Sequence, residues 1–219
     1  MSFAIIFDMD GVIVDTNPYH TLAIQQFCST HKFQLDESTL QQKIYGRTNR
    51  DWITNLFGKL SEEQLYTYAN EKELLFRTLY EPHIKPVAGL VKFLDLLVTN
   101  NIPRAIATSA PIENVDFVLS KTGLRKYFDT ILDERMVTQG KPNPEIYLKT
   151  AAALGLPNEK CIVIEDSLSG VTAGRESGSK VIGITTTHTA EELAGTNLVI
   201  HNFNDLNLFV LIHILEKEN

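Results

Sequence analysis

Two aspartates, separated by one residue, follow a short apolar run near the start of the 219-residue chain. The run 3–7 is typical of a strand buried on both faces of a parallel sheet, and Asp8, Asp10 and Gly11 come directly after it. Side chains alternate along an extended backbone, so the two carboxylates project to the same side. Like charges this close repel each other unless a cation or a shared proton offsets them. The pair therefore indicates chemistry, and an Asx-turn after a strand is the structural alternative.

Three later loops carry side chains that fit the same chemistry. In chain order they contribute Thr108 and Ser109, then Lys141, then Glu165 and Asp166. In an open parallel sheet, ligands bind outside the carboxyl ends of the strands, where we expect these loops to lie. Acids, a hydroxyl and an ammonium group together suit the task of holding a divalent cation beside a phosphoryl group.

These loop residues also have structural alternatives. Ser109 would serve equally well as the N-cap of a helix that begins at Pro111, although the backbone amides there form an anion site in either case. The pair Glu165 and Asp166 would favour the N-terminal dipole of the helix that follows it. Magnesium prefers oxygen ligands, which makes Asp8 and Asp166 its natural side-chain ligands. Glu165 either ligates through water or orients Asp166.

The elements that must position these loops alternate between strands and helices. Strands are expected at 3–7, 102–107, 129–132, 161–164, 180–184 and 198–200. Helices are expected at 87–100, 111–122 and 205–215. Two more are expected, one that follows the loop 141–144 and ends at 154, and one that begins at 167. This alternation predicts an α/β fold with a doubly wound, mostly parallel Rossmann-like sheet and helices on both faces.

The segment between the first two strands is predicted to contain helices alone. They are expected at 17–31, 36–44, 48–57 and 62–80. Asn17 and Pro18 suit the N-cap and first position of the first of these helices. We therefore expect an inserted helical cap domain at 17–85 and an α/β core domain formed by 1–16 and 86–219.

The helix at 62–80 carries a lysine on its apolar face. Ser61 to Gln64 form a capping-box pattern that defines the helix start. Lys72 then falls in the middle of one helical stripe, whose other members are Leu65, Tyr68, Ala69, Phe76 and Leu79. Such a lysine usually extends its ammonium group out to water. The alternative is that this face borders a cleft, where Lys72 meets an anion.

Composition excludes several classes of protein. The formal net charge of −7 argues against nucleic acid as a partner, so an anionic substrate must be attracted by a local cluster of cations. The two cysteines, Cys28 and Cys161, are expected to be free buried thiols in a reducing compartment. The first residues lack the basic region and the longer apolar stretch of a signal peptide, so none is expected. No apolar run approaches the length that a membrane-spanning helix needs. We expect a soluble, cytoplasmic monomer.

The string Asp8-Met-Asp-Gly-Val-Ile-Val-Asp-Thr16 resembles the first signature of the haloacid dehalogenase superfamily of aspartate-nucleophile phosphotransferases. Three later signatures appear in the right order, at Thr108, at Lys141 and at Glu165–Asp166, so the resemblance covers almost the whole chain. The pattern is most similar to the β-phosphoglucomutase-like branch.

The resemblance assigns roles to the loop residues. Asp8 is implied as the nucleophile, and Asp10 as the general acid that protonates the leaving oxygen and then the base that activates the next acceptor. The backbone carbonyl of Asp10 is implied as a further Mg²⁺ ligand. Thr108 would hydrogen-bond a phosphate oxygen, and Lys141 would neutralise charge on Asp8 and on the phosphoryl group. The acid at position 10 speaks against dehalogenation and against phosphonate cleavage.

The resemblance also implies that the cap brings its own residues to the substrate. His20 matches a histidine that helps to position the general acid/base, and Lys72 matches a cap lysine. The phosphate-binding arginine of the mutases should occupy position 49, which here is Asn49, so Arg47 or Arg50 would have to replace it. The remaining expected substrate-binding residues are Thr16, Ser109 and Ala110.

The sequence thus predicts a magnesium-dependent phosphohydrolase of a small phosphorylated metabolite, such as a sugar phosphate, acting through an aspartyl-phosphate. The first alternative is a β-phosphoglucomutase, which returns the phosphoryl group to the sugar. A non-catalytic sugar-phosphate sensor is the second, and it is disfavoured because a sensor could dispense with Asp8 or Asp10.

Overall fold

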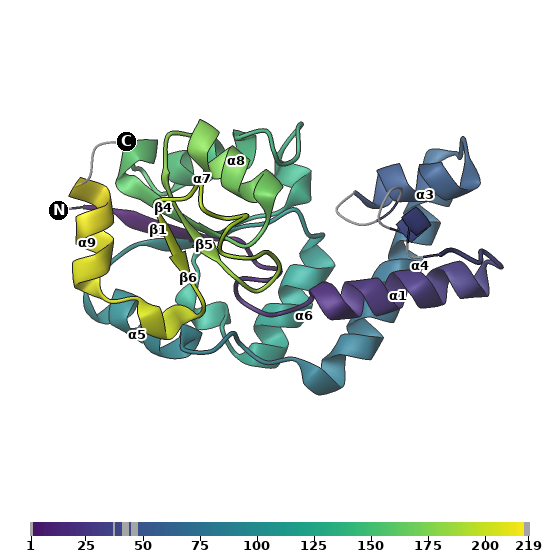
Figure 1. Ribbon diagram of the computed structural model, residues 1–219, viewed down its shortest axis with the longest axis horizontal. Coiled ribbons are helices and arrows are strands. Elements are labelled where there is room, and N and C mark those ends of the chain that lie inside the picture. Colours follow the sequence, from purple (N-terminus) through teal and green to yellow (C-terminus); the bar gives the residue numbers. More distant parts are fainter. Residues whose placement is uncertain (1, 37, 41–43, 45–47, 217–219) are drawn as a thin grey trace. The chain divides into compact units, whose positions relative to one another are not determined.

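The structure is a computed structural model that describes residues 2–36, 38–40, 44 and 48–216. The chain forms two compact units (Figure 1). The sheet unit comprises the residues up to Asp15 together with those from Ile84 onward, and the helical unit comprises Thr16–His83.

The sheet unit contains a six-stranded sheet in which every neighbouring pair of strands is parallel. Its strands are β1 (Ala4–Phe7), β2 (Arg104–Ala107), β3 (Thr130–Leu132), β4 (Cys161–Glu165), β5 (Lys180–Ile184) and β6 (Leu198–Ile200). They are ordered β3-β2-β1-β4-β5-β6, so the chain winds outward from β1 in one direction and then from β4 in the other. The predicted doubly wound, Rossmann-like fold is confirmed, and the switch in direction lies between β1 and β4.

Helices cover both faces of this sheet (Figure 1). They are α5 (Leu90–Thr99), α6 (Ile112–Thr122), α7 (Glu145–Ala153), α8 (Leu168–Glu176) and α9 (Leu208–Glu216). Right-handed crossovers put α5 and α6 on one face, and they put α7 and α8 on the other. Figure 1 shows the sheet between these two pairs.

Strand alternation decides which side chains reach the α7 face. Ile6 of β1 and Val163 of β4 pack in one core cluster with Tyr147 of α7. Two residues further along each strand, Asp8 and Glu165 follow on the same side. The opposite face is filled by aromatic rings around Phe7, namely Phe93, Phe128 and Phe203.

Several predicted boundaries are wrong by one to three residues. Helix α1 begins at Asn17 and has Thr16 as its N-cap, so Asn17 is not the cap. Helix α5 begins at Leu90 because Gly89 adopts φ 81°, a left-handed conformation that interrupts the helix expected from residue 87. Helix α9 begins at Leu208, after a short 3₁₀ turn.

The helical unit is built from α1 (Asn17–Thr30), α3 (Asn49–Phe57) and α4 (Glu62–Tyr80), and residues 38–40 are also helical. Its core is an apolar cluster of Ile24, Phe27, Cys28, Leu40, Ile44, Trp52, Ile53 and Leu65. The capping box is confirmed, because Ser61 Oγ accepts from Gln64 N and Gln64 Oε1 accepts from Ser61 N. It defines the register of α4.

Cys28 and Cys161 are free and buried, as expected. Among the described residues, no helix is both long and apolar enough to cross a membrane.

Candidate active site

The register of the central strands brings the first acidic loop beside the last. Phe7 of β1 pairs with Ile164 of β4, and the backbone N–H of Asp8 continues the ladder by donating to Ile164 O at 3.1 Å. Because the carboxyl ends of both strands lie at the same edge of the sheet, Asp8 emerges next to Glu165. Two residues more than 150 positions apart in the sequence thus become neighbours.

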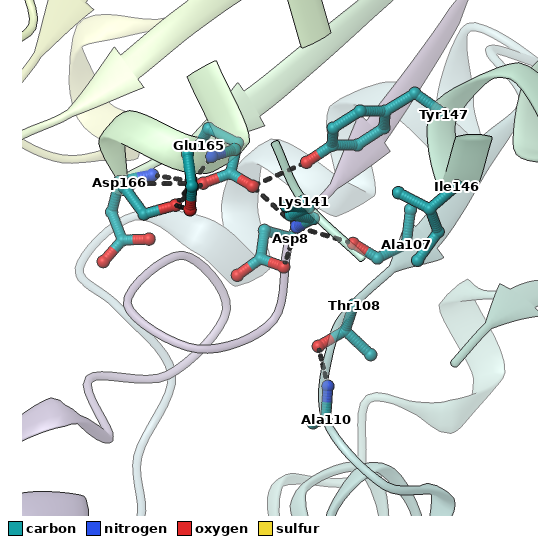
Figure 2. A network of polar contacts seen from close by, with 12 residues as sticks. Asp8, Ala107, Thr108, Ala110, Lys141, Ile146, Tyr147, Glu165 and Asp166 are labelled. Atoms are coloured by element: carbon teal, nitrogen blue, oxygen red, sulfur yellow. Dashed lines mark hydrogen bonds and ion pairs between the residues drawn. The ribbon is translucent and has the colours of Figure 1, made fainter. Parts of the chain in front are cut away.

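Lys141 joins these two carboxylates (Figure 2). Its Nζ lies 2.6 Å from Asp8 Oδ1 and 2.6 Å from Glu165 Oε1, and it also donates to the carbonyl oxygen of Ala107 at 3.3 Å. All three charged side chains are almost completely buried. The loop before α7 therefore places an ammonium group at the carboxyl edge of β1, β2 and β4.

Glu165 is held from several directions. Its Oε1 accepts from the Tyr147 hydroxyl at 2.6 Å as well as from Lys141 (Figure 2). Its Oε2 accepts from the backbone N–H of Asp166, from the backbone N–H of Ser167 and from Ser167 Oγ, at 3.0–3.1 Å. A Cβ at Gly170 would lie only 1.8 Å from Oε1, so glycine is required there. Glu165 was expected either to bind the metal through water or to orient Asp166, and these hydrogen bonds favour the second role.

Asp166 is fixed by two loops. Its Oδ2 accepts a short hydrogen bond from Thr187 Oγ1, on the segment after β5. A Cβ at Gly11, whose φ is 76°, would lie 1.9 Å from the same oxygen, so the turn after Asp10 must be glycine. Asp10 is half-buried in that turn and its backbone bridges to Val14. The two predicted metal-ligand loops are therefore in close contact.

The three buried acids fit a divalent cation. One carboxylate oxygen from each of Asp8, Glu165 and Asp166 lies within 4.8 Å of the others, and oxygen donors are what Mg²⁺ prefers. Burial, and to a lesser extent the neighbouring carboxylates, raises the pKa of Asp8 well above its usual value, although Lys141 opposes this. Burial and the charge of Glu165 raise the pKa of Asp166 to about 7. The cluster of carboxylates thus has more negative charge than the surrounding protein stabilises.

Lys141 and Glu165 are shifted toward their charged forms. Burial alone would lower the pKa of the ammonium group and raise that of the Glu165 carboxyl. The Asp8 and Glu165 charges nevertheless raise the Lys141 pKa well above its usual value. Lys141, together with hydrogen bonds from Tyr147 and Ser167, lowers the Glu165 pKa. This pair is therefore ionised at neutral pH.

The second predicted loop lies after β2. Thr108 is buried, and its Oγ1 accepts from the backbone N–H of Ala110 at 3.1 Å (Figure 2). Among the described residues the hydroxyl proton has no acceptor, so it is available to a ligand oxygen. Ser109 is exposed and does not cap α6, whose N-cap is Pro111. The structural alternative for Ser109 is therefore wrong.

The predicted residues of the helical unit form a cluster of their own. Lys72 is only 5% exposed, so its ammonium group does not extend to water. Its Nζ donates to His20 Nδ1 at 2.8 Å and to Glu73 Oε1 at 2.8 Å. The His20 ring stacks on Phe76, with centroids 3.7 Å apart. Thr16 is buried, and its carbonyl oxygen accepts from His20 N at 3.0 Å.

The residue at the mutase arginine position faces this cluster. Asn49 Nδ2 donates to Glu73 Oε1 at 2.8 Å, and Asn49 Oδ1 accepts from Trp52 Nε1 at 3.0 Å. Arg50 instead forms an exposed two-pronged ion pair with Glu62, and Arg47 lies outside the described residues. These contacts therefore do not identify either arginine as a ligand of the substrate phosphate.

Three residues of these networks were missed from the sequence. Tyr147 and Glu73 fall within predicted helices and Thr187 falls between two predicted strands, but the sequence singled out none of them. The preceding Lys72 offered a signal for Glu73, because a lysine on a buried stripe needs a carboxylate within reach. No local signal marks Tyr147 or Thr187, since their partners are far away in the sequence.

The buried acids, the buried lysine and the hydroxyl loop all lie at the carboxyl edge of the parallel sheet, which is where such folds bind their ligands. The model of the haloacid dehalogenase-like hydrolase family matches residues 5–184. The chain belongs to this family and is an enzyme of it, as the resemblance predicted.

Relatives and solved structures agree with this assignment. The chain is 30% identical over 203 residues to a phosphorylated carbohydrates phosphatase of Thermotoga maritima, covering 92% of this chain and 87% of the relative. It is 28% identical over 216 residues to a β-phosphoglucomutase of Bacillus subtilis, covering 95% and 93%. A crystal structure of a family IA, variant 3 hydrolase from Entamoeba histolytica matches with a TM-score of 0.91 at 33% identity, covering 99% of this chain and 100% of that one.

Proposed function

We propose that this enzyme is a magnesium-dependent phosphohydrolase that releases phosphate from a small phosphorylated metabolite, such as a sugar phosphate, through an aspartyl-phosphate. The observation that carries the proposal is the contact of Lys141 with both Asp8 and Glu165 at the carboxyl edge of the sheet. A buried ammonium group favours the anionic form of the carboxylate that it contacts, and it offsets the charge of an incoming phosphoryl group. The phosphatase of carbohydrates among the relatives suggests the substrate class.

Asp8 attacks phosphorus in this mechanism, and the bond to the leaving oxygen breaks. Asp10 donates its proton to that oxygen and then removes a proton from the water that hydrolyses the aspartyl-phosphate. Lys141 stabilises the negative charge on the phosphoryl oxygens. The Thr108 hydroxyl and the backbone N–H of Ser109 bind the same oxygens, and the backbone N–H of Ala110, which donates to Thr108 Oγ1, orients that hydroxyl.

Asp8, Asp166 and the Asp10 carbonyl would hold the magnesium ion, with Glu165 as a further ligand or as their orienting partner. When bound, the ion would offset the surplus of carboxylate charge and polarise the phosphoryl group. Support for this assignment comes from the spacing of the three carboxylates and from the raised pKa of Asp8 and of Asp166.

We also propose that the helical segment predicted at 17–85 acts as a cap domain and that His20 and Lys72 contact the substrate. Support comes from the sequence pattern at these positions and from the hydrogen bond that joins the two side chains.

A β-phosphoglucomutase is the second candidate, and it is favoured by the mutase among the relatives. A mutase must hold an intermediate with a second phosphate, which requires cations beyond Lys72. Asn49, at the position of the mutase arginine, is neutral and its amide is used by Glu73 and Trp52. This difference favours hydrolysis.

Phosphate release from p-nitrophenyl phosphate, with and without magnesium, tests the proposed reaction. A panel of sugar phosphates then tests the substrate class, and β-glucose 1-phosphate with glucose 1,6-bisphosphate is assayed for isomerisation. We expect magnesium-dependent phosphate release and little isomerisation. Efficient formation of glucose 6-phosphate with little released phosphate would instead establish the mutase.

A further inference from the structure

The polar cluster of the helical unit, formed by His20, Asn49, Lys72 and Glu73, is electrically balanced. The Lys72 ammonium lies 2.8 Å from the Glu73 carboxylate, and both side chains are 6–7% exposed. Burial alone would raise the pKa of Glu73, but the charges of Lys72 and His20 and the hydrogen bonds from Asn49 and Lys72 lower it to about 2. Glu73 is therefore ionised wherever Lys72 is protonated, and the two charges cancel.

While His20 accepts a hydrogen bond from the Lys72 ammonium, the other members of this cluster add no charge. An ammonium group only donates hydrogen bonds, so His20 Nδ1 must accept from Lys72 and the ring contributes a lone pair there. Asn49 is neutral, and both ends of its amide are used, one by Glu73 and one by Trp52. The cluster therefore has one cation and one anion.

Lys72 nevertheless retains hydrogen-bonding capacity. Of its three N–H donors, one is directed to His20 and one to Glu73. Among the described residues, the third donor has no hydrogen-bond partner. A single donor on a neutralised cation suits one oxygen of a hydroxyl group, whereas a phosphate dianion needs several donors and a net positive charge.

We propose that Glu73 is a specificity-determining residue that neutralises Lys72, so that the enzyme takes monophosphates whose far end carries hydroxyl groups and discriminates against bisphosphates. This inference rests on the proposed function, because it assumes that Lys72 contacts the substrate. It names the substrate class as polyol or sugar monophosphates. Glu73 acts through charge and needs no contact of its own with the substrate.

The test compares fructose 1-phosphate with fructose 1,6-bisphosphate, which differ by one phosphate at the far end. Affinities are measured by calorimetry with magnesium in an Asp8→Asn background, which prevents turnover. Glu73→Gln keeps the shape and removes the charge. It should raise the affinity for the bisphosphate, relative to the monophosphate, by about tenfold or more.

Two further variants show whether charge is the cause. Lys72→Gln leaves Glu73 unbalanced, so the same affinity ratio should fall below that of the parent, and the double variant should return it to about the parent value. Glu71→Gln is the matched control, because Glu71 lies on the same helix but pairs with His31. It should leave the ratio unchanged.

Thermal unfolding of each variant confirms that it folds. An unchanged ratio in folded Glu73→Gln, while the unmodified enzyme releases phosphate from fructose 1-phosphate, would overturn this inference and leave the proposed function intact. If Glu73→Gln does not fold, the fall expected for Lys72→Gln decides the matter, and its absence overturns the inference. If the unmodified enzyme releases phosphate from neither ligand nor from p-nitrophenyl phosphate, both proposals fail.

Discussion

Each unit of this enzyme buries a lysine, but the two lysines are balanced differently. Lys141 contacts Asp8 and Glu165 and lies in a cluster that also holds Asp166, so three buried carboxylates surround one ammonium group. In the helical unit, Lys72 faces the single carboxylate of Glu73. The sheet site therefore has surplus negative charge, and the cluster of the helical unit has none.

The difference has a chemical consequence. Buried surplus charge is unfavourable and makes a cluster receptive to a divalent cation, which suits phosphoryl transfer. A balanced pair is satisfied without any ion and can offer only directional hydrogen bonds. Changes in the sheet site should therefore affect the reaction itself, whereas changes in the helical unit should affect which substrate is taken.

The largest effect is expected at Asp8. Asp8→Asn preserves the shape of the side chain but removes the attacking charge, so kcat should fall by about 10³-fold or more. Circular dichroism and thermal unfolding should show an intact fold. Retention of a tenth of the activity would exclude the covalent mechanism.

The second prediction is that the surplus negative charge of the sheet site makes the reaction depend on a divalent metal ion. Excess EDTA should abolish phosphate release from p-nitrophenyl phosphate and magnesium should restore it, whereas calcium should inhibit because its coordination shell is larger and looser. Asp166→Ala should raise the magnesium concentration for half-maximal activity about 100-fold. Glu145→Gln serves as the control, because this acid of α7 binds Thr138 and Lys149 instead. Full activity in EDTA would contradict the metal assignment.

The sequence predicted the sheet site better than the cluster of the helical unit, and the reason is physical. Apolar runs that end in Asp8 and Glu165 define buried strands, and alternation then fixes the side of the sheet on which each acid lies. Glu73 has no such local signature. Its burial depends on tertiary packing, which brings Asn49 of α3 to Glu73 and His20 of α1 to the neighbouring Lys72.

Boundaries failed for a similar reason. Helical periodicity extends through residues 87–89, but the left-handed conformation of Gly89 delays the start of α5. The role of Tyr147 depends on its contact with Glu165, which is 18 residues away on another element. Periodicity identifies buried faces, and it does not identify the polar partners that meet on them.

Truncation of Lys72 should produce a smaller, substrate-dependent effect. Lys72→Ala removes a charge-assisted hydrogen bond, so kcat/KM for a sugar phosphate should fall about 10- to 100-fold. Turnover of p-nitrophenyl phosphate should change far less, because this compound has no hydroxyl groups at its far end. Equal losses for both substrates would place Lys72 in the reaction itself and remove the contrast between the units.

The smallest effect concerns pH and again distinguishes the two clusters. The folded-state pKa of Asp166, about 7, lies above the ordinary value for an aspartate, so folding favours the protonated form. Its contribution to stability is therefore fully present below about pH 4 and is lost as the pH rises through about 7. Magnesium competes with this proton, because it binds the ionised carboxylate.

Magnesium affinity should consequently rise about tenfold between pH 6 and pH 8, measured by calorimetry on the wild-type protein. The increase in melting temperature caused by saturating magnesium should be larger at pH 8 than at pH 6. Asp166→Asn cannot titrate, so it should lose most of this pH dependence. Glu73→Gln should retain it, because the carboxyl of Glu73 has a pKa of about 2 and stays ionised throughout this range. A pH dependence that persists unchanged in Asp166→Asn would assign the titration to another group of the sheet site, with Asp8 as the next candidate because its pKa is also raised.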